Sequence, residues 1–556
     1  MSAQKNLILL LFCSLTLTTA CQKNTGNEIA KKAAAYKGPV VKNDWMILSL
    51  GANPDNLNPL LSTDAYSPVV TGYVFDSLVY YDLKTGEPVG RLAKSWTISK
   101  NGLTYDFYLR KNAYFHDGKP VTAKDVKFSF DLLKNPKIDA ANIQNYYRNL
   151  KSTEIVGPYH VRFHLTKLYY RNLINLGTYQ IMPEHIYGKG DFNTNPANQH
   201  PIGSGPYVFE KWDQGRAISL KRFDKFWGVN DPYWKDKFNF KKILIRIILE
   251  DSVSAMALKK GSIDMMPNPT PKQYVTDFAG KDFESRFYRL KFTTADGNGY
   301  RYIGWNLREP KFQSRDVRRA LAMAMPREKL DQKMYKGLMT LSVGPLPQGS
   351  PKLDPSVKPI PYDLKGATAL LAKAGWKDTN GDGILDKNGK KFEFELLFTA
   401  QNPAIERIAL VYQESLKKLG INLKIHTLEW TVFLKQLMSD HFDACLLAWG
   451  SSLDSDPYQI WHSSQITKGG SNRIAYRNKR VDYLLEKARR TLDRKKRNKL
   501  YQEFSKIIAD DAPYLFIFER PNLFITTKRF KNVLPVGKLG PDVDGFFTPP
   551  GLEKYK

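Results

Sequence analysis

Oxygen-bearing side chains recur at short intervals between residues 378 and 386, in a pattern that could bind a calcium ion. The donors are Asp378, Asn380, Asp382 and Asp386. The bidentate glutamate expected at the twelfth position of such a loop is replaced by Gly389. Turns rich in Asp and Asn produce the same pattern without a metal. The spacing therefore leaves two interpretations, a weak calcium loop or a series of capped turns.

Motifs for covalent or metal-assisted catalysis are not found in the sequence, which has no G-x-S-x-G, no H-E-x-x-H and no P-loop. His116-Asp117 could pair as a base and its orienting acid. However, Asp117-Gly118 reads as a turn before a helix start, with Thr122 as the N-cap. Two catalytic carboxylates cannot be recognised without geometry, so an exported hydrolase stays open as an alternative.

Cys21 directly follows a short apolar segment at the N-terminus. Residues 1–5 are weakly positive and residues 7–17 are apolar, which is typical of a secretory signal. The apolar stretch is too short to span a bilayer, which takes roughly 20 residues. A cysteine at this point resembles the lipobox of bacterial lipoproteins, in which acyl chains on the cysteine hold the protein to a membrane. Thr18 stands where that motif usually has Leu, and an ordinary signal with an incidental cysteine is the alternative.

The composition indicates a folded chain of several cores without disulfides. The 556 residues are 42% hydrophobic and 13% aromatic, which excludes a disordered chain. Cys13 lies in the signal and Cys21 would be acylated, so Cys445 has no partner for an internal disulfide. Stability must then come from the area of the hydrophobic core.

The net charge of +29 invites a nucleic-acid interpretation, but the charge is spread along the chain and an exported lipoprotein seldom meets nucleic acid. We therefore expect no nucleic-acid partner. The one dense cluster, residues 494–499, opens a helix with apolar residues at helical spacing: Leu500, Phe504, Ile507 and Ile508. We expect this cluster to be a solvated face, with attraction to an acidic membrane surface as the alternative.

The segment from 391 to 449 alternates strand-like and helix-like stretches. Residues 391–400, 421–430 and 442–449 read as strands, and residues 403–420 and 431–440 as helices. This order predicts right-handed crossovers and a largely parallel sheet. Ligands bind beyond the carboxyl ends of such strands, which points to Trp430 and to the segment after Trp449.

Several blocks of sequence resemble the peptide-binding class, family 5, of bacterial extracellular solute-binding proteins of ABC transporters. The strongest block combines residues 92–96, 103–111 and 115–126. Further matches follow in the family's order, at residues 203–207, 226–227, 306, 317–321, 326–328, 362–363, 370–376, 442–443, 449, 456–457 and 472. Asp is usual where this chain has Pro326, and Asn is usual at Phe223. The resemblance spans about residues 45 to 530.

The resemblance implies an α/β, periplasmic-binding-protein-like fold, with two lobes that close about a hinge and an inserted extra α/β domain. Residues 1–21 would be the lipoprotein signal peptide and 22–43 a polar tether. Lobe I would comprise residues 44–77, 187–288 and 525–556, domain II residues 78–186, and lobe II residues 289–524.

The function implied is a non-catalytic one. The protein would capture peptides and deliver them to the permease subunits of an ABC importer, as a monomer without a cofactor. It would be lipid-anchored to a membrane, in the periplasmic space or at the cell surface. Relatives with the same fold carry nickel chelates, haem or oligosaccharides, so those ligands stay open as alternatives.

The resemblance also implies ligand contacts. An Asp shortly after the Trp of this family's GW segment pairs with the ligand ammonium. Asp454 is the best candidate at the shifted spacing found here, with a turn carboxylate as its alternative role, and Asp456 is the second acid of this segment. Oligopeptide members that grip a carboxylate with Arg have Leu446 in that position here, which favours a long or blocked peptide.

Aromatic residues would supply the walls of the site. Trp430 and Trp449 match positions that line the pocket or pack in the core, and these two roles cannot be separated from sequence. Tyr458 and Trp461 lie on the loop after Trp449 and would add aromatic surface.

Overall fold

The computed structural model of the chain describes residue 36 and residues 38–294, 297, 299–399, 403–467 and 470–555. The predicted signal segment and Cys21, the predicted site of acylation, lie outside these described residues, as does most of the predicted tether. Within the described part of the chain, no helix is both long enough and apolar enough to cross a membrane.

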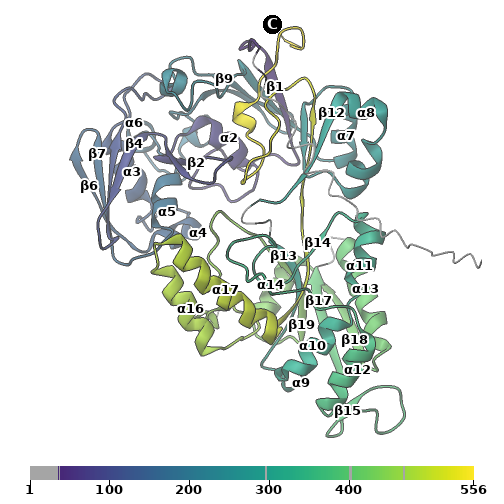
Figure 1. The fold of residues 1–556 in the computed structure, drawn as a ribbon. Helices are drawn as coiled ribbons and strands as arrows, with labels where there is room; N and C mark the ends of the chain where they lie inside the picture. The colour runs from purple at the N-terminus through teal and green to yellow at the C-terminus, as the bar shows by residue number, and fades with distance from the viewer. Residues whose placement is uncertain are drawn as a thin grey trace, which may run out of the picture.

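The segments predicted to form lobe I combine strands from distant parts of the sequence (Figure 1), and the names lobe I, domain II and lobe II are kept below for the predicted segments. One sheet has the order β1 (Trp45–Leu50), β10 (Lys242–Ile247), β9 (Ala217–Arg222) and β8 (Tyr207–Asp213). A second has the order β11 (Met265–Pro267), β21 (Asn522–Thr527) and β12 (Phe287–Phe292). The helices of this part are α2 (Ser67–Val74), α7 (Asp251–Lys259) and α8 (Lys281–Arg286). Strands from the beginning, middle and end of the chain therefore meet in one body.

A buried ionic cluster fixes the C-terminal tail to lobe I. Arg529 Nη2 lies 2.6 Å from Asp264 Oδ2, and Arg529 also pairs with Asp44. The backbone N–H of Ile47, in β1, donates to the same Asp264 oxygen at 2.8 Å. Because the two carboxylates are fully buried, each needs its cationic and N–H partners to offset the cost of burial.

Domain II is built on a four-stranded antiparallel sheet. Its strands, in spatial order, are β4 (Ala93–Ile98), β5 (Thr104–Leu109), β7 (His160–Leu165) and β6 (Leu150–Gly157). A short hairpin, β2 (Val79–Tyr81) with β3 (Pro88–Gly90), precedes it. The helices are α3 (Ala123–Leu132), α4 (Ala141–Gln144), α5 (Asn172–Thr178) and α6 (Glu184–Tyr187). In β5 every second side chain is buried, namely those of Tyr105, Phe107 and Leu109.

The turn at His116 joins domain II to lobe I and has a structural role. The ring Nε2 of His116 bonds the carbonyl of Gly205 at 3.0 Å, and the N–H of Gly203 donates to Nδ1 at 3.4 Å. Gly118 has φ +89°, as the predicted turn requires, and Thr122 caps α3 together with Asp125. This geometry matches the structural interpretation of His116-Asp117.

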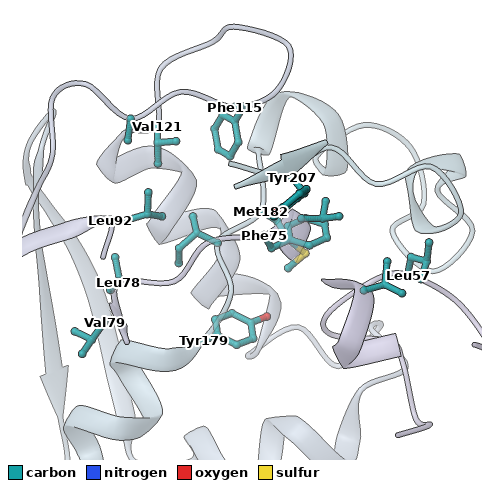
Figure 2. Close-up of a cluster of buried hydrophobic side chains, with 14 of the residues drawn as sticks. Leu57, Phe75, Leu78, Val79, Leu92, Phe115, Val121, Tyr179, Met182 and Tyr207 are labelled. Atoms are coloured by element: carbon teal, nitrogen blue, oxygen red, sulfur yellow. The ribbon is translucent and has the colours of Figure 1, made fainter. Parts of the chain in front are cut away.

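One continuous hydrophobic core runs through lobe I and domain II. Phe75 and Tyr207 of lobe I lie in the same buried cluster as Leu92, Val121 and Met182 of domain II, as Figure 2 shows. Each of these side chains is at most 1% exposed. Because a shared close-packed core resists relative motion, we infer that lobe I and domain II move as a single body.

Lobe II contains a six-stranded sheet. The spatial order is β14 (Thr340–Leu341), β20 (Tyr514–Glu519), β13 (Tyr300–Trp305), β19 (Ala444–Trp449), β17 (Glu393–Thr399) and β18 (Asn422–Leu428). The strands β17, β18 and β19 are parallel, as predicted. The prediction of a largely parallel sheet is wrong for the other half, because β13 runs antiparallel to both β19 and β20. A small hairpin, β15 (Asp386–Lys387) with β16 (Lys390–Lys391), lies outside this sheet.

The helices of lobe II are α9 (Pro310–Gln313), α10 (Arg315–Met323), α11 (Arg327–Leu330), α12 (Leu364–Lys373), α13 (Pro403–Lys417), α14 (Trp430–Met438), α15 (Tyr458–Trp461), α16 (Lys479–Arg489) and α17 (Arg494–Asp511). The helix predicted over residues 403–420 is confirmed as α13, whose Ile408, Tyr412 and Leu416 recur at helical spacing and are fully buried. Gly420, with φ +73°, follows the end of this helix.

The basic cluster at the start of α17 is only partly solvated, so that prediction is wrong at one position. Arg497 is 4% exposed, and its guanidinium lies 4.1 Å from the ring centroid of Tyr170 in domain II. In Figure 1, α16 and α17 lie below α4 and α5 of domain II. Arg497 therefore belongs to the contact between domain II and lobe II.

Two predicted domain limits fall inside strands of one sheet. The limit at 288/289 cuts β12, and the limit at 524/525 cuts β21, yet these strands pair with each other along their whole length. The division into three domains stays a prediction. We place the two crossings between the lobes just after β12 and just before β21.

Candidate functional site

Two adjoining cavities separate lobe II from the body formed by lobe I and domain II. The first, about 690 Å³, is lined by domain II residues such as Arg148 and Tyr169 and by the lobe II segments 345–352 and 449–461. The second, about 430 Å³, lies between lobe II and residues 268–271 of lobe I. Both volumes are in the range of small-molecule sites. Four residues line both cavities: Gly299, Tyr300, Trp449 and Gly450.

The junction of the two cavities requires a glycine. Gly299 has φ +87°, and a Cβ atom there would lie 1.8 Å from the carbonyl oxygen of Trp449. No side chain fits that space. The backbone just before β13 therefore packs directly against the end of β19, at the point where the two cavities join.

Trp449 ends β19 and forms a wall between the cavities. Its ring is parallel to that of Tyr302, with centroids 6.3 Å apart, and its Nε1 donates to the Tyr514 hydroxyl at 3.5 Å. The guanidinium of Arg473 lies 5.9 Å from the Trp449 ring centroid. The side chain is half-buried, so one part packs on the core and the other part faces the cavities.

Three further predicted residues cluster along the loop after Trp449. Asp456 lines the first cavity, but its Oδ2 is 2.9 Å from Arg489 Nε and accepts from the Tyr169 hydroxyl at 2.9 Å. The ring of Tyr458 lies between the guanidinium of Arg489, at 4.1 Å, and the ring of His462. Trp461 is buried among other aromatic rings and is one of the residues that line the first cavity.

Asp454 is engaged by two cations. Its Oδ1 lies 2.6 Å from Lys352 Nζ and its Oδ2 lies 3.0 Å from Arg497 Nη2. Burial acts to raise the pKa of Asp454, but Lys352 and Arg497 outweigh it and the pKa is lowered. The residue does not line either cavity, and its backbone carbonyl accepts from Tyr170 and Arg171 of domain II. These contacts match the alternative role given for Asp454 from sequence, a carboxylate that stabilises a turn.

Trp430 is placed apart from the other candidates. It begins α14 instead of ending a strand, is 44% exposed, and stacks on Phe433 with ring centroids 5.9 Å apart. It does not line either of the two cavities.

The loop at 378–386 has the geometry of capped turns. Asp378 accepts from the N–H groups of Gly381 and Gly383, and Asp386 accepts from Thr379. The Nζ of Lys391 lies 2.6 Å from Asp382 Oδ2, where a cation would bind. Among the described residues, no group of three His, Cys, Asp or Glu side chains could hold a metal ion. The hydrogen bonds of this segment are those of capped turns, and calcium binding there stays a prediction.

Sequence reasoning missed one acidic residue of the first cavity. Glu519 ends β20, after the apolar run from Tyr514 to Phe518, and is 4% exposed. Burial raises its pKa to about 7, against the effect of a hydrogen bond from the Gln348 N–H. The sequence feature that could have identified Glu519 is a charged residue at the end of an apolar strand.

Comparison with known proteins gives one consistent result. Residues 87–471 match the family described as "Bacterial extracellular solute-binding proteins, family 5 Middle". The oligopeptide-binding protein AppA of Bacillus subtilis (strain 168) is 35% identical over 527 residues, which cover 92% of each chain.

Solved structures extend the similarity to the fold. AppA from Bacillus subtilis in complex with a nonapeptide has a TM-score of 0.72 and 31% identity, covering 92% of this chain and all of that chain. NikZ from Campylobacter jejuni in complex with Ni(L-His) has a TM-score of 0.71 and 30% identity, covering 91% of this chain and all of that chain.

Proposed function

Because this chain belongs to family 5 of the bacterial extracellular solute-binding proteins, we propose that it captures peptides and delivers them to an ABC importer. The observation that carries the proposal is the pair of adjoining cavities between lobe II and the opposite body, joined at Gly299 and Trp449. An extended ligand could occupy both cavities and contact both bodies at once. Its binding would therefore favour closure of the lobes about the two crossings.

The lining suits a ligand whose side chains vary. Aromatic surface comes from Trp449 and Tyr300, and bare backbone comes from Gly299 and Gly450. Aromatic faces accept many side chains, whereas backbone groups recognise the main chain that all peptides share. Several charged side chains of the first cavity are already engaged, as Arg489 is by Asp456. This combination supports peptides more directly than a single rigid solute.

The location is part of the proposal. The N-terminal signal would export the chain, and acyl groups on Cys21 would hold it to a membrane beside the permease subunits. We propose that the protein acts there as a monomer and without catalysis. An oligosaccharide, a nickel chelate or haem is the alternative cargo on the same fold.

Calorimetric titration with peptides of two to nine residues tests the proposal. We expect saturable binding of a subset of lengths at one site per chain, with the peptides recovered intact after incubation. Titration with oligosaccharides, nickel–histidine and haem provides the comparison. If one of these ligands binds tightly and no peptide binds, the fold assignment stands but the proposal that the cargo is a peptide is rejected. Cleavage of a bound peptide would contradict the proposal that the protein acts without catalysis.

A further inference from the structure

Glu519 has one carboxylate oxygen without a partner. Its Oε1 accepts from the Gln348 N–H at 2.9 Å, whereas Oε2 is buried and has no hydrogen-bond partner. Among the described residues, no Lys, Arg or His side chain forms an ion pair with it. Because a buried carboxylate that lacks partners is costly, Glu519 either takes up a proton or meets a cation from outside the protein.

The surroundings of Glu519 place it on the first cavity. Tyr300 lies directly opposite it on β13, and both residues line that cavity. Burial raises the pKa of Tyr300 well above its ordinary value, so this phenol stays neutral. The neighbouring Arg301 and Arg520 line the second cavity and not the first.

The remaining charged groups around the first cavity are Lys352 on the adjoining loop, Asp456 and Arg489 across it in lobe II, and Arg148 and Arg171 in domain II. Lys352 pairs with Asp454, and Asp456 pairs with Arg489. Arg171 donates to the carbonyl of Asp454 at 2.8 Å. Of the two acids that line the cavity, Asp456 thus has its cation within the protein, and Glu519 does not.

We propose that Glu519 receives a cationic nitrogen of the ligand, an ammonium or guanidinium group, in the first cavity. The inference rests on the proposed peptide capture and specifies the chemistry of one subsite. A cation at Oε2 would complete the pairing that the protein leaves open and would favour the ionised carboxylate. Binding would then release a proton when it occurs near neutral pH, because the unliganded group is partly protonated there.

Matched peptides test this subsite. The set consists of nonapeptides of Ala and Ser with blocked ends. Each peptide carries a single Lys, at a different position in each member of the set. Every peptide is paired with a neutral version in which this Lys is replaced by Nε-acetyl-lysine. One further pair differs only in acetylation of the N-terminus. Dissociation constants are measured by calorimetry at pH 6 and pH 8 for the unaltered protein and for Glu519→Gln. The Gln side chain retains an oxygen for the Gln348 N–H but no charge.

At pH 8 we expect at least one cationic peptide to bind about tenfold more tightly than its neutral partner, a typical worth of a charge-assisted contact. The ratio of the two dissociation constants should fall about tenfold between pH 8 and pH 6, because the carboxylate becomes protonated over this range. Glu519→Gln should bind neutral peptides as before and lose both the preference and its pH dependence. As a control, Glu503→Gln changes an exposed acid that pairs with Arg480 on the surface, and should alter neither.

Two failures can be told apart. If peptides bind but cationic and neutral partners bind equally, or if Glu519→Gln keeps the preference, the subsite is wrong and peptide capture stands. If none of the nonapeptides and shorter peptides binds, peptide capture fails and the subsite fails with it. Tighter binding of neutral peptides at low pH would also overturn the subsite, because it would show Glu519 acting as a protonated donor.

Discussion

Arg497 and Asp454 form a buried ion pair across 43 positions of sequence, with Nη2 3.0 Å from Oδ2. The same guanidinium stacks on Tyr170 of domain II, and the carbonyl of Asp454 accepts from the Tyr170 hydroxyl at 2.9 Å. The pair therefore holds the loop that follows Trp449 against domain II. Through that loop it positions one wall of the first cavity.

Replacing Arg497 should destabilise lobe II. Arg497→Ala leaves Asp454 with only part of its buried charge compensated, and loss of one partner of a buried pair typically costs about 3 kcal/mol. We expect a lower midpoint of thermal unfolding, measured by circular dichroism. Arg494→Ala is the matched control, because its contact with Glu87 is exposed and should contribute well below about 1 kcal/mol. Equal midpoints for the two variants would contradict this role of Arg497.

The two tryptophans proposed from sequence should differ in their effect on binding. Trp449→Ala removes a wall shared by both cavities, and we expect peptide affinity to fall about tenfold or more. Trp430→Ala removes an exposed ring that lines neither cavity, so affinity should stay within about twofold. Calorimetry with one tightly bound peptide measures both. A larger loss for Trp430→Ala would reverse our assignment of the wall.

His116 should make the protein sensitive to acid. Burial lowers the pKa of His116 to about 4, from 6.5. The stability linked to the neutral form of His116 is therefore fully present above pH 6.5. This contribution, up to about 3 kcal/mol, is lost as the pH falls from 6.5 through about 4. We expect His116→Gln to unfold with a weaker dependence on pH in this window. His164→Gln, at a site bonded to Glu154 on the surface, should keep the original dependence.

Cys445 should be chemically inert in the folded protein. It is 1% exposed, and burial raises the pKa of its thiol to about 12, so little thiolate exists at neutral pH. In a Cys21→Ser variant processed after export, a thiol reagent such as DTNB should react only after denaturant is added. Rapid reaction of one thiol under native conditions would contradict the burial.

The proposed lipid anchor at Cys21 has its own test. Cys21→Ser should move the protein from the membrane fraction to the soluble fraction after cell breakage, and should remove incorporation of labelled palmitate. Peptide binding should be unchanged, because the cavities lie in residues well beyond the tether. Membrane association of the serine variant would instead point to its positive charge.

Periodic features of the sequence predicted the local structure well. The stripe of α13 was readable because Ile408, Tyr412 and Leu416 recur at helical spacing. Trp449 was a candidate because ligands bind beyond the carboxyl ends of parallel strands; β19 is such a strand, and Trp449 lines both cavities. These signals depend only on neighbours in sequence.

Ion pairs and strand pairing between residues far apart in the chain could not be predicted from the sequence. Asp454 looked like an available carboxylate because its partners, Lys352 and Arg497, come from distant segments that only the fold brings together. Arg497 looked solvated for the same reason. Glu519 faces the cavity because β20 pairs with β13 in a register that places it opposite Tyr300, and no local pattern fixes that register.

The most direct test of the central claim is to identify what the protein carries. The protein, purified under native conditions, is examined by native mass spectrometry, and its bound molecules are released and sequenced. We predict a family of peptides, one per chain, with varied side chains. A single non-peptide species, such as a sugar or a metal chelate, would contradict peptide capture.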